Sequence, residues 1–174
     1  MKRAVIGIVA HVDSGKTTLS EAILKASGVI RAAGRVDHGN SFLDTDQVEK
    51  ERGITIFMGS AAFERSGVSF TLLDTPGHVD FSPETERALR VLDAAVLVIS
   101  GVDGVQSHTI TLWRLLAHYE IPTIIFINKL DIAARSREDL IRELSDTFGS
   151  GFADFTGESL CATLSDVSPA ELLS

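Results

Sequence analysis

The sequence has little cysteine, no long apolar run and no excess of positive charge, which are features of disulfide-rich secreted, membrane-spanning and nucleic-acid-binding proteins respectively. Its single cysteine, Cys161, leaves no partner for an intramolecular disulfide, which excludes a disulfide-stapled scaffold. No apolar run approaches the roughly 18 residues that cross a bilayer. Lys and Arg number 16 against 24 Asp and Glu, and this net charge of −8 disfavours autonomous nucleic-acid binding. We therefore expect a cytoplasmic protein without a membrane partner.

The rest of the composition is that of an ordinary globular domain. Hydrophobic residues make up 44% and charged residues 23% of the 174 positions, which excludes intrinsic disorder. This length corresponds to one domain that can bury a proper core. We expect the domain core to span residues 1–148. Residues 149–174 begin with a Gly-, Ser- and Asp-rich stretch, which predicts the start of an insertion or loop.

Short apolar runs alternate with helical segments along the chain. Continuous apolar runs are typical of parallel strands covered on both faces, and the more alternating runs at 54–57 and 68–72 favour a sheet edge or a strand with one wetter face. Strands are expected at 4–9, 54–57, 68–73, 94–99 and 123–127, and helices at about 17–26, 83–92, 108–119 and 136–148. The pattern predicts a three-layer, doubly wound, mostly parallel α/β sheet that binds ligands at its carboxyl edge.

A phosphate-loop motif follows the first expected strand. Residues 10–17 fit the pattern G-x-x-x-x-G-K-[ST], except that Ala10 replaces the first glycine. The N–H groups of such a loop point at phosphate oxygens, Lys16 would reach the β- and γ-phosphates, and the Thr17 hydroxyl would bind Mg²⁺. The fold class is therefore that of the P-loop NTPases. The predicted nucleotide-binding residues are Ala10, His11, Val12, Asp13, Ser14, Gly15, Lys16, Thr17 and Thr18.

A second polar segment follows the strand that ends at Leu73. An aspartate in the position of Asp74, facing a phosphate loop, can hold Mg²⁺ through water. The bare N–H of Gly77 can approach a γ-phosphate. Taken alone, the segment also fits an ordinary Asp-Pro-Gly turn, but the phosphate loop beside it favours a nucleotide site. The residues predicted to line it are Asp74, Thr75, Pro76, Gly77 and His78.

A base-reading segment follows the strand at 123–127. The carboxylate of Asp131 can accept from both the N1–H and the 2-amino group of guanine, a pair of donors that adenine lacks. The stem of Lys129 would lie along the base and Asn128 would brace the loop, with Leu130 between them. Such a site discriminates because the wrong base leaves a charge unpaired. Alone the segment could be a solvated helix cap, but three motifs in this order indicate a GTP site.

The order of these motifs and the residues within them resemble those of the translational GTPases of the elongation factor G group. The resemblance covers residues 3–148 and is carried by A-H-V-D-S-G-K-T-T, by R-G-I-T at 52–55 and by D-T-P-G-H-V-D-F. Within the group the sequence is most similar to tetracycline-resistance ribosomal protection proteins. The segments that favour these proteins lie at 42–46, 49–56 and 126–129. An elongation factor G-type translocase is the alternative.

The resemblance implies an enzyme that hydrolyses GTP to GDP and phosphate on the ribosome. Thr55 would close over Mg²⁺ and the γ-phosphate, and His78 would orient the attacking water. Taken alone, Thr55 also fits an edge-strand threonine and His78 a turn cap. Val12 and Ile54 would form a hydrophobic gate for His78. Hydrolysis without the ribosome is expected to be slow, and most ribosome contacts are expected outside this domain.

The family's fifth motif is not found in the sequence. It is a Ser-Ala turn whose backbone meets the guanine O6, and Ser150-Gly151 and Ser159-Leu160 are poor substitutes. We therefore expect residues 149–174 to precede a final strand and helix, and this chain to bind GDP more weakly than a longer one.

Two other classes of function stay open: a P-loop kinase or ATPase, and a guanine-nucleotide switch module that does not hydrolyse GTP.

Overall fold

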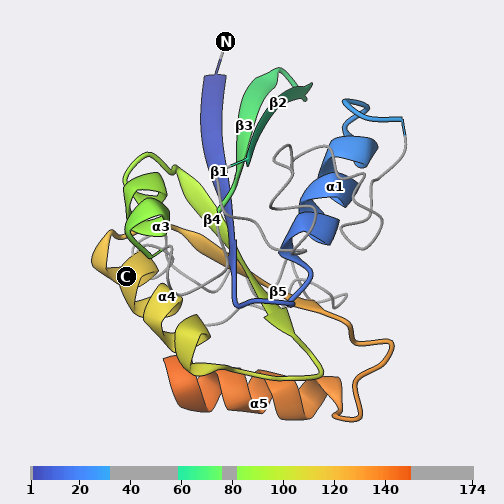
Figure 1. Cartoon of the computed structure of the whole chain (residues 1–174), viewed down its shortest axis with the longest axis vertical. Coiled ribbons are helices and arrows are strands. Elements are labelled where there is room, and N and C mark those ends of the chain that lie inside the picture. The colour runs from blue at the N-terminus through green and yellow to red at the C-terminus, as the bar shows by residue number, and fades with distance from the viewer. Residues whose placement is uncertain (1, 32–58, 76–81, 150–174) are drawn as a thin grey trace, which may run out of the picture.

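A computed structural model describes residues 2–31, 59–75 and 82–149, which form one five-stranded sheet with helices around it (Figure 1). The strands are β1 (Lys2–Ala10), β2 (Gly59–Arg65), β3 (Val68–Asp74), β4 (Ala94–Ser100) and β5 (Thr123–Asn128). The helices are α1 (Lys16–Ala26), α3 (Ser82–Leu89), α4 (Ser107–His118) and α5 (Arg137–Phe148). The sheet order is β2-β3-β1-β4-β5, and every pairing is parallel except that of β2 with β3.

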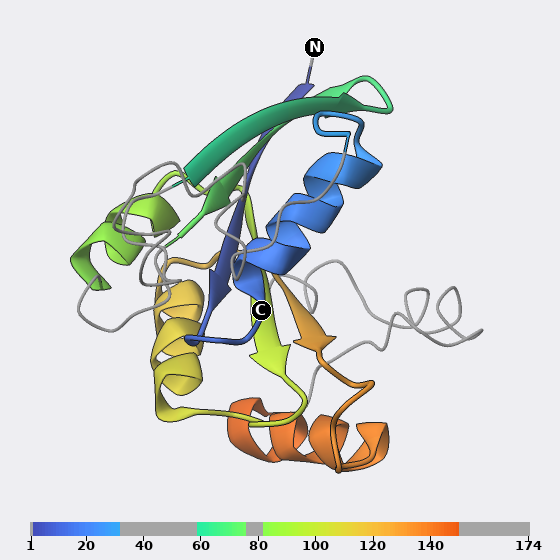
Figure 2. The ribbon, with the colours of Figure 1, turned by 45° about the vertical axis from the view of Figure 1, so that its right-hand side comes forward.

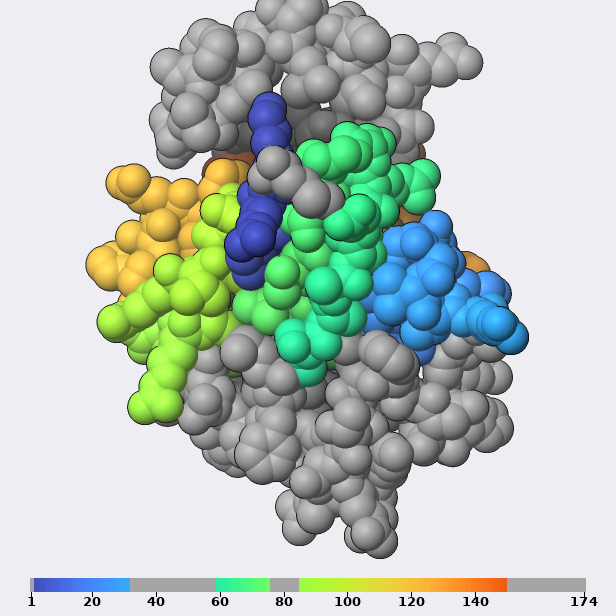
Figure 3. Space-filling model, turned by 90° about the horizontal axis from the view of Figure 1, so that it is seen from above, coloured from blue at the N-terminus to red at the C-terminus, as the bar shows by residue number. Residues whose placement is uncertain are grey.

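The helices lie on both faces of the sheet, which confirms the predicted three-layer architecture. Helix α1 covers β1 and β3 on one face, and α3, α4 and α5 lie against the other (Figure 2). A buried hydrophobic cluster fills the space between the sheet and the helices on each face. The cluster on the α1 face includes Ile8, Leu24, Leu72 and Val98. The cluster on the other face includes Val9, Leu97, Leu112, Leu116 and Leu144. Seen end-on in Figure 3, β1 lies between the β2–β3 hairpin and the segment leading into β4.

Strand β2 was not predicted from the sequence. It contains Gly59, Ser60, Ala61 and Ala62, which have low strand propensity, and its pairing with β3 holds it in the sheet. Its Phe63 stacks on Phe70 of β3 with ring centroids 5.1 Å apart. The sheet-edge interpretation of residues 68–72 is wrong, because β3 lies between β1 and β2. The expected strand at 54–57 lies outside the described residues.

Helix α3 ends at Leu89 instead of continuing to about residue 92. The segment that follows turns to meet β1: the Asp93 N–H donates to the Val5 carbonyl at 2.9 Å. The Val5 N–H donates in return to Asp93 Oδ2 at 2.7 Å. A continued helix would break this reciprocal pair, so a long-range contact decides where α3 stops.

One part of the α1 face lacks a helix among the described residues. Ile124 and Phe126 of β5 continue the row formed by Val96 and Val98 of β4 in register. They are 54% and 41% exposed, whereas Val98 is fully buried. Helix α1 covers the strands on the far side of β4, which leaves this apolar strip at the β5 edge. None of the helices in the described ranges has the length and apolar content to cross a bilayer.

Candidate functional site

The three sequence motifs meet at the carboxyl edge of the sheet. Parallel pairing of β1, β3 and β5 with their neighbours places Ala10, Asp74 and Asn128 at strand ends on this edge. Asp74 is paired in register with Ile8, and Asn128 with Ser100. This is the edge where ligands bind in open α/β sheets.

The phosphate loop turns sharply between β1 and α1. Two residues have left-handed backbone, Asp13 with φ 60° and Gly15 with φ 86°. Gly15 is the N-cap of α1, so the helix begins at Lys16 and its first N–H groups face the loop. The Ser14 N–H donates to the His11 carbonyl at 3.3 Å, which closes the turn. The loop thus presents backbone donors and the positive end of a helix at one point, as anion sites do.

Asp74 is the charged centre of the site. Its side chain is fully buried, and Lys16 Nζ lies 2.7 Å from Oδ1 in an ion pair. The Thr17 hydroxyl donates to Oδ2 at 3.2 Å. Lys16 is itself only 8% exposed, so both charges of the pair lie away from bulk water. The structure therefore brings together the three side chains predicted to handle phosphate and Mg²⁺.

The side chains of Thr17 and Asp74 supply the kind of oxygen that Mg²⁺ prefers. This ion keeps several waters and is usually held by one or two carboxylates together with phosphate oxygens. The Thr17 hydroxyl would be a direct ligand, and Asp74 Oδ2, 3.2 Å from it, is near enough to hold the ion through water.

Asn128 joins the base-reading segment to the phosphate loop. Its amide Nδ2 donates to the Ser14 carbonyl at 3.0 Å. The same amide lies so close to Gly15 that a Cβ at Gly15 would overlap it. Bracing by Asn128 was predicted from the sequence, but its partner in the phosphate loop was not. One side chain thus fixes the distance between the phosphate and base ends of the site.

The residues that follow Asn128 leave β5 and expose Asp131. Lys129 has left-handed backbone, with φ 59°, which turns the chain away from the sheet. Helix α5 then begins at its N-cap Ser136, whose hydroxyl accepts from the Asp139 N–H at 3.1 Å. The Ser136 hydroxyl also donates to the Asp139 carboxylate at 2.7 Å, and this bond lowers the pKa of Asp139 below its ordinary value. The capped helix fixes the far end of the base-reading segment.

Two contacts in the site were not predicted. The His11 ring meets His108 of α4 edge-on, with centroids 5.9 Å apart, so α4 touches the phosphate loop. Thr75 is fully buried and its hydroxyl donates to the Ile8 carbonyl at 2.9 Å, which ties the end of β3 to β1. Neither has a local signal in the sequence, because each joins residues that are distant in the sequence and meet only in the folded chain.

The remaining predicted residues divide into two groups. Val12 is half-buried in the phosphate loop, Thr18 is exposed on α1 and Leu130 is 42% exposed. The others lie outside the described residues, and their roles stay predictions. They are Ile54, Thr55, Pro76, Gly77 and His78.

The chain is similar over most of its length to proteins with guanine-nucleotide domains. The profile of the family described as "Elongation factor Tu GTP binding domain" matches residues 1–169. A tetracycline resistance protein, TetP of Clostridium perfringens, is 54% identical over 132 residues, 75% of this chain and 20% of that protein. Elongation factor G of Mycoplasma pneumoniae is 46% identical over 143 residues, 82% of this chain and 21% of that protein. The chain thus spans about a fifth of these relatives.

The fold of this chain is also similar to the folds of solved protein structures. A crystal structure of a Thermus thermophilus protein matches with a TM-score of 0.80 and 34% identity, covering 84% of this chain and 22% of that one. Translation elongation factor SelB from Methanococcus maripaludis, solved with the GTP analogue GppNHp, matches with a TM-score of 0.59 and 27% identity. That match covers 82% of this chain and 25% of SelB.

Proposed function

Because this chain belongs to the elongation factor Tu GTP-binding domain family, we propose that it binds GTP at the carboxyl edge of its sheet and hydrolyses it to GDP and phosphate. The observation that carries the proposal is the Asn128 amide on the Ser14 carbonyl, which sets the base-reading segment against the phosphate loop. Lys16 and Thr17 in that loop already face Asp74. A P-loop kinase or ATPase would need no residue that recognises guanine. Asp131, three residues after Asn128 in the base-reading segment, therefore favours a GTPase.

The whole protein acts on the ribosome and protects it from tetracycline. Relatives that carry the name tetracycline resistance protein support this reading, with 54% identity for TetP and 47% for TetS of Listeria monocytogenes. Elongation factor G at 46% identity supports the second candidate, a translocase. A translation assay with and without the drug separates the two. Both candidates place the protein in the cytoplasm, with most ribosome contacts in parts of the relatives that this chain does not span.

Phosphate binding competes with the Asp74 carboxylate for Lys16 and Thr17. The nucleotide's β- and γ-phosphates offer Lys16 Nζ a larger set of anionic oxygens than the Asp74 carboxylate does. Thr17, Thr55 and, through water, Asp74 would hold Mg²⁺, which would supply neutralisation of the phosphate charge.

Hydrolysis depends on His78, which orients the attacking water. The motifs contain no candidate arginine finger, so the chain alone should turn over GTP more slowly than about 1 s⁻¹. With ribosomes present, we expect His78→Ala to lower the single-turnover rate by about 100-fold and to leave GDP affinity unchanged. Quench-flow measurement of phosphate release checks this. Equal, measurable rates for wild type and His78→Ala would contradict this role of His78, and no phosphate release by either protein would support a switch module that does not hydrolyse.

Gly15→Ala should weaken binding of a fluorescent GDP analogue by about 10-fold. The added Cβ overlaps Asn128 Nδ2 and breaks the brace, in addition to straining a backbone at φ 86°. Gly28→Ala is the matched control, because Gly28 has φ 80° and nothing within 4 Å of its added Cβ. Equilibrium titration of both variants measures the difference. Equal losses of affinity would show that backbone strain alone, and not the brace, affects the site.

The uncovered strip on β5 supports our division of the chain into a core over 1–148 and an inserted loop over 149–174. Ile124 and Phe126 are large apolar side chains, 54% and 41% exposed, on an edge strand. A further strand beside β5 and a helix beside α1 would remove them from water.

A further inference from the structure

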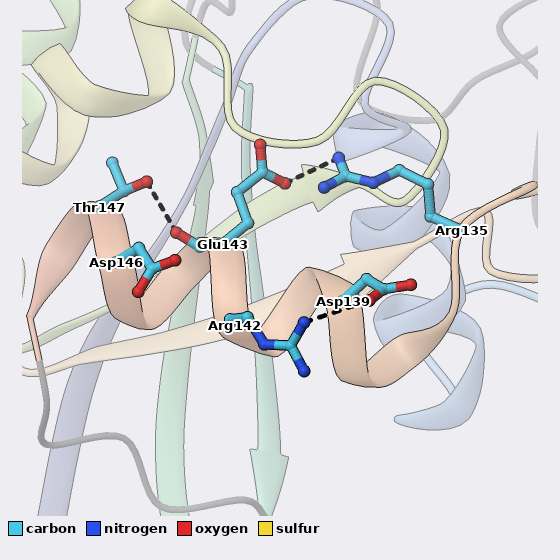
Figure 4. A pocket seen from close by; sticks show the side chains of 6 residues that line it. All are labelled: Arg135, Asp139, Arg142, Glu143, Asp146 and Thr147. Atoms are coloured by element: carbon cyan, nitrogen blue, oxygen red, sulfur yellow. Dashed lines mark hydrogen bonds and ion pairs between the residues drawn. The ribbon is translucent and has the colours of Figure 1, made fainter.

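An ion pair lies on the surface beside the base-reading segment. Arg135 Nη1 is 2.8 Å from Glu143 Oε2, and the side chains are 39% and 28% exposed (Figure 4). Arg135 lies between Asp131 and the N-cap of α5, whereas Glu143 comes from the second turn of that helix. The pair therefore connects the residues just after the base-reading segment to the middle of α5.

The same carboxylate also holds the loop of residues 101–106, between β4 and α4. Its Oε1 accepts a hydrogen bond from the Val105 N–H at 3.4 Å. Gly104, with φ 68°, approaches so closely that a Cβ there would lie 2.5 Å from Arg135 Nη1 and 2.7 Å from Glu143 Oε2. A glycine at this position lets the loop backbone reach the pair. The pair thus connects three segments that are distant in sequence.

Both ends of the 101–106 loop contact the nucleotide site. At its start, the Gly101 N–H donates to the Asn128 carbonyl at 2.8 Å, and a Cβ on Gly101 would lie 3.1 Å from that oxygen. At its end α4 begins, where His108 meets His11 of the phosphate loop. The loop is also braced internally, since the Gly104 N–H donates to the Ser100 carbonyl at 2.8 Å. A displacement at Glu143 is therefore passed to the backbone that supports the guanine reader.

We infer that Arg135 and Glu143 are positioning residues for guanine selection. This inference rests on the proposed function of the site. The pair acts through the 101–106 loop and fixes the backbone from Asn128 to Asp131, so that the Asp131 carboxylate meets both guanine donors at once. Loss of the pair lets that carboxylate move, and recognition of the second donor suffers most. Phosphate binding changes less, because Lys16 and its partners lie at the other end of the site.

The test compares GDP with IDP, whose base lacks the 2-amino group, on the full 174-residue chain. We expect Glu143→Ala to lower GDP affinity by about fivefold and IDP affinity by less than about twofold, so that discrimination narrows. Glu143→Gln keeps an acceptor for the Val105 N–H and should recover most of the discrimination. Asp146→Ala is the matched control: it removes the same charge from an exposed position on α5 and should leave both affinities unchanged.

Three results would overturn the inference. One is a wild-type ratio of GDP to IDP affinity in Glu143→Ala, even if its thermal unfolding midpoint falls, because that pattern means a purely structural pair. Another is an equal narrowing in Asp146→Ala, which means a general charge effect. The third is wild-type protein that binds GDP no better than ADP; this contradicts the proposed function itself, and the wild-type titration detects it before any variant is compared.

Discussion

Asp131→Asn is expected to reverse the base preference of the site from guanine to xanthine. Asparagine offers one acceptor and one donor where aspartate offers two acceptors, so it cannot take both the N1–H and the 2-amino group of guanine. Xanthine carries a carbonyl oxygen in place of that amino group, and the new amide N–H can donate to it. GDP affinity should fall by about 1000-fold, and XDP should bind better than GDP, because sites built on such hydrogen bonds discriminate strongly.

Competition titrations of the variant with GDP and XDP measure this reversal. Asp146→Asn on α5 makes the same chemical change at an exposed position and should retain the wild-type preference. Asp131 is exposed and lies three residues after Asn128, whose amide binds the Ser14 carbonyl. The fold should therefore tolerate the substitution, so that a change in affinity reports on base recognition. An Asp131→Asn variant that still prefers GDP over XDP would assign base recognition to another part of the chain.

Lys16→Ala should abolish nucleotide binding and also destabilise the fold. The substitution removes the cation that faces the phosphates and leaves the fully buried Asp74 carboxylate without its ion-pair partner at 2.7 Å. Breaking a buried pair on one side costs about 3–5 kcal/mol. The Thr17 hydroxyl still donates to Asp74, so the lower end of that range, about 3 kcal/mol, is expected.

A second substitution separates the two effects. Lys16→Ala combined with Asp74→Asn removes the unpaired charge, so urea unfolding should show most of the lost stability regained while GDP binding stays absent. Lys25→Ala, an exposed lysine near the end of the same helix, should change neither property. Unchanged stability in Lys16→Ala, or recovered GDP binding in the double variant, would contradict the role assigned to the Lys16–Asp74 pair.

The sequence predicted well the parts of the structure that depend on local pattern. Continuous apolar runs identified β1, β4 and β5 to within one or two residues at each end. The rule that ligands bind at the carboxyl ends of parallel strands then placed Lys16, Asp74 and Asn128 on one edge, where the structure has them.

The features that the sequence missed depend on long-range contacts. Strand β2 has low intrinsic propensity and owes its conformation to β3, and α3 stops early because Asp93 bonds to Val5. The Arg135–Glu143 pair was not predicted from the sequence. Its link to Val105, 38 positions from Glu143, appears only once α5 lies against the loop after β4.

Displacement of a fluorescent GTP analogue from the wild-type chain shows whether one site joins phosphate binding to guanine recognition. The probe, bound in Mg²⁺ buffer, is titrated with GDP and, separately, with ADP. GDP should displace the probe at least about 100-fold more effectively than ADP, since Asp131 can pair with two donors that adenine lacks. Equal displacement by the two nucleotides, or no binding of the probe, would contradict such a joint site.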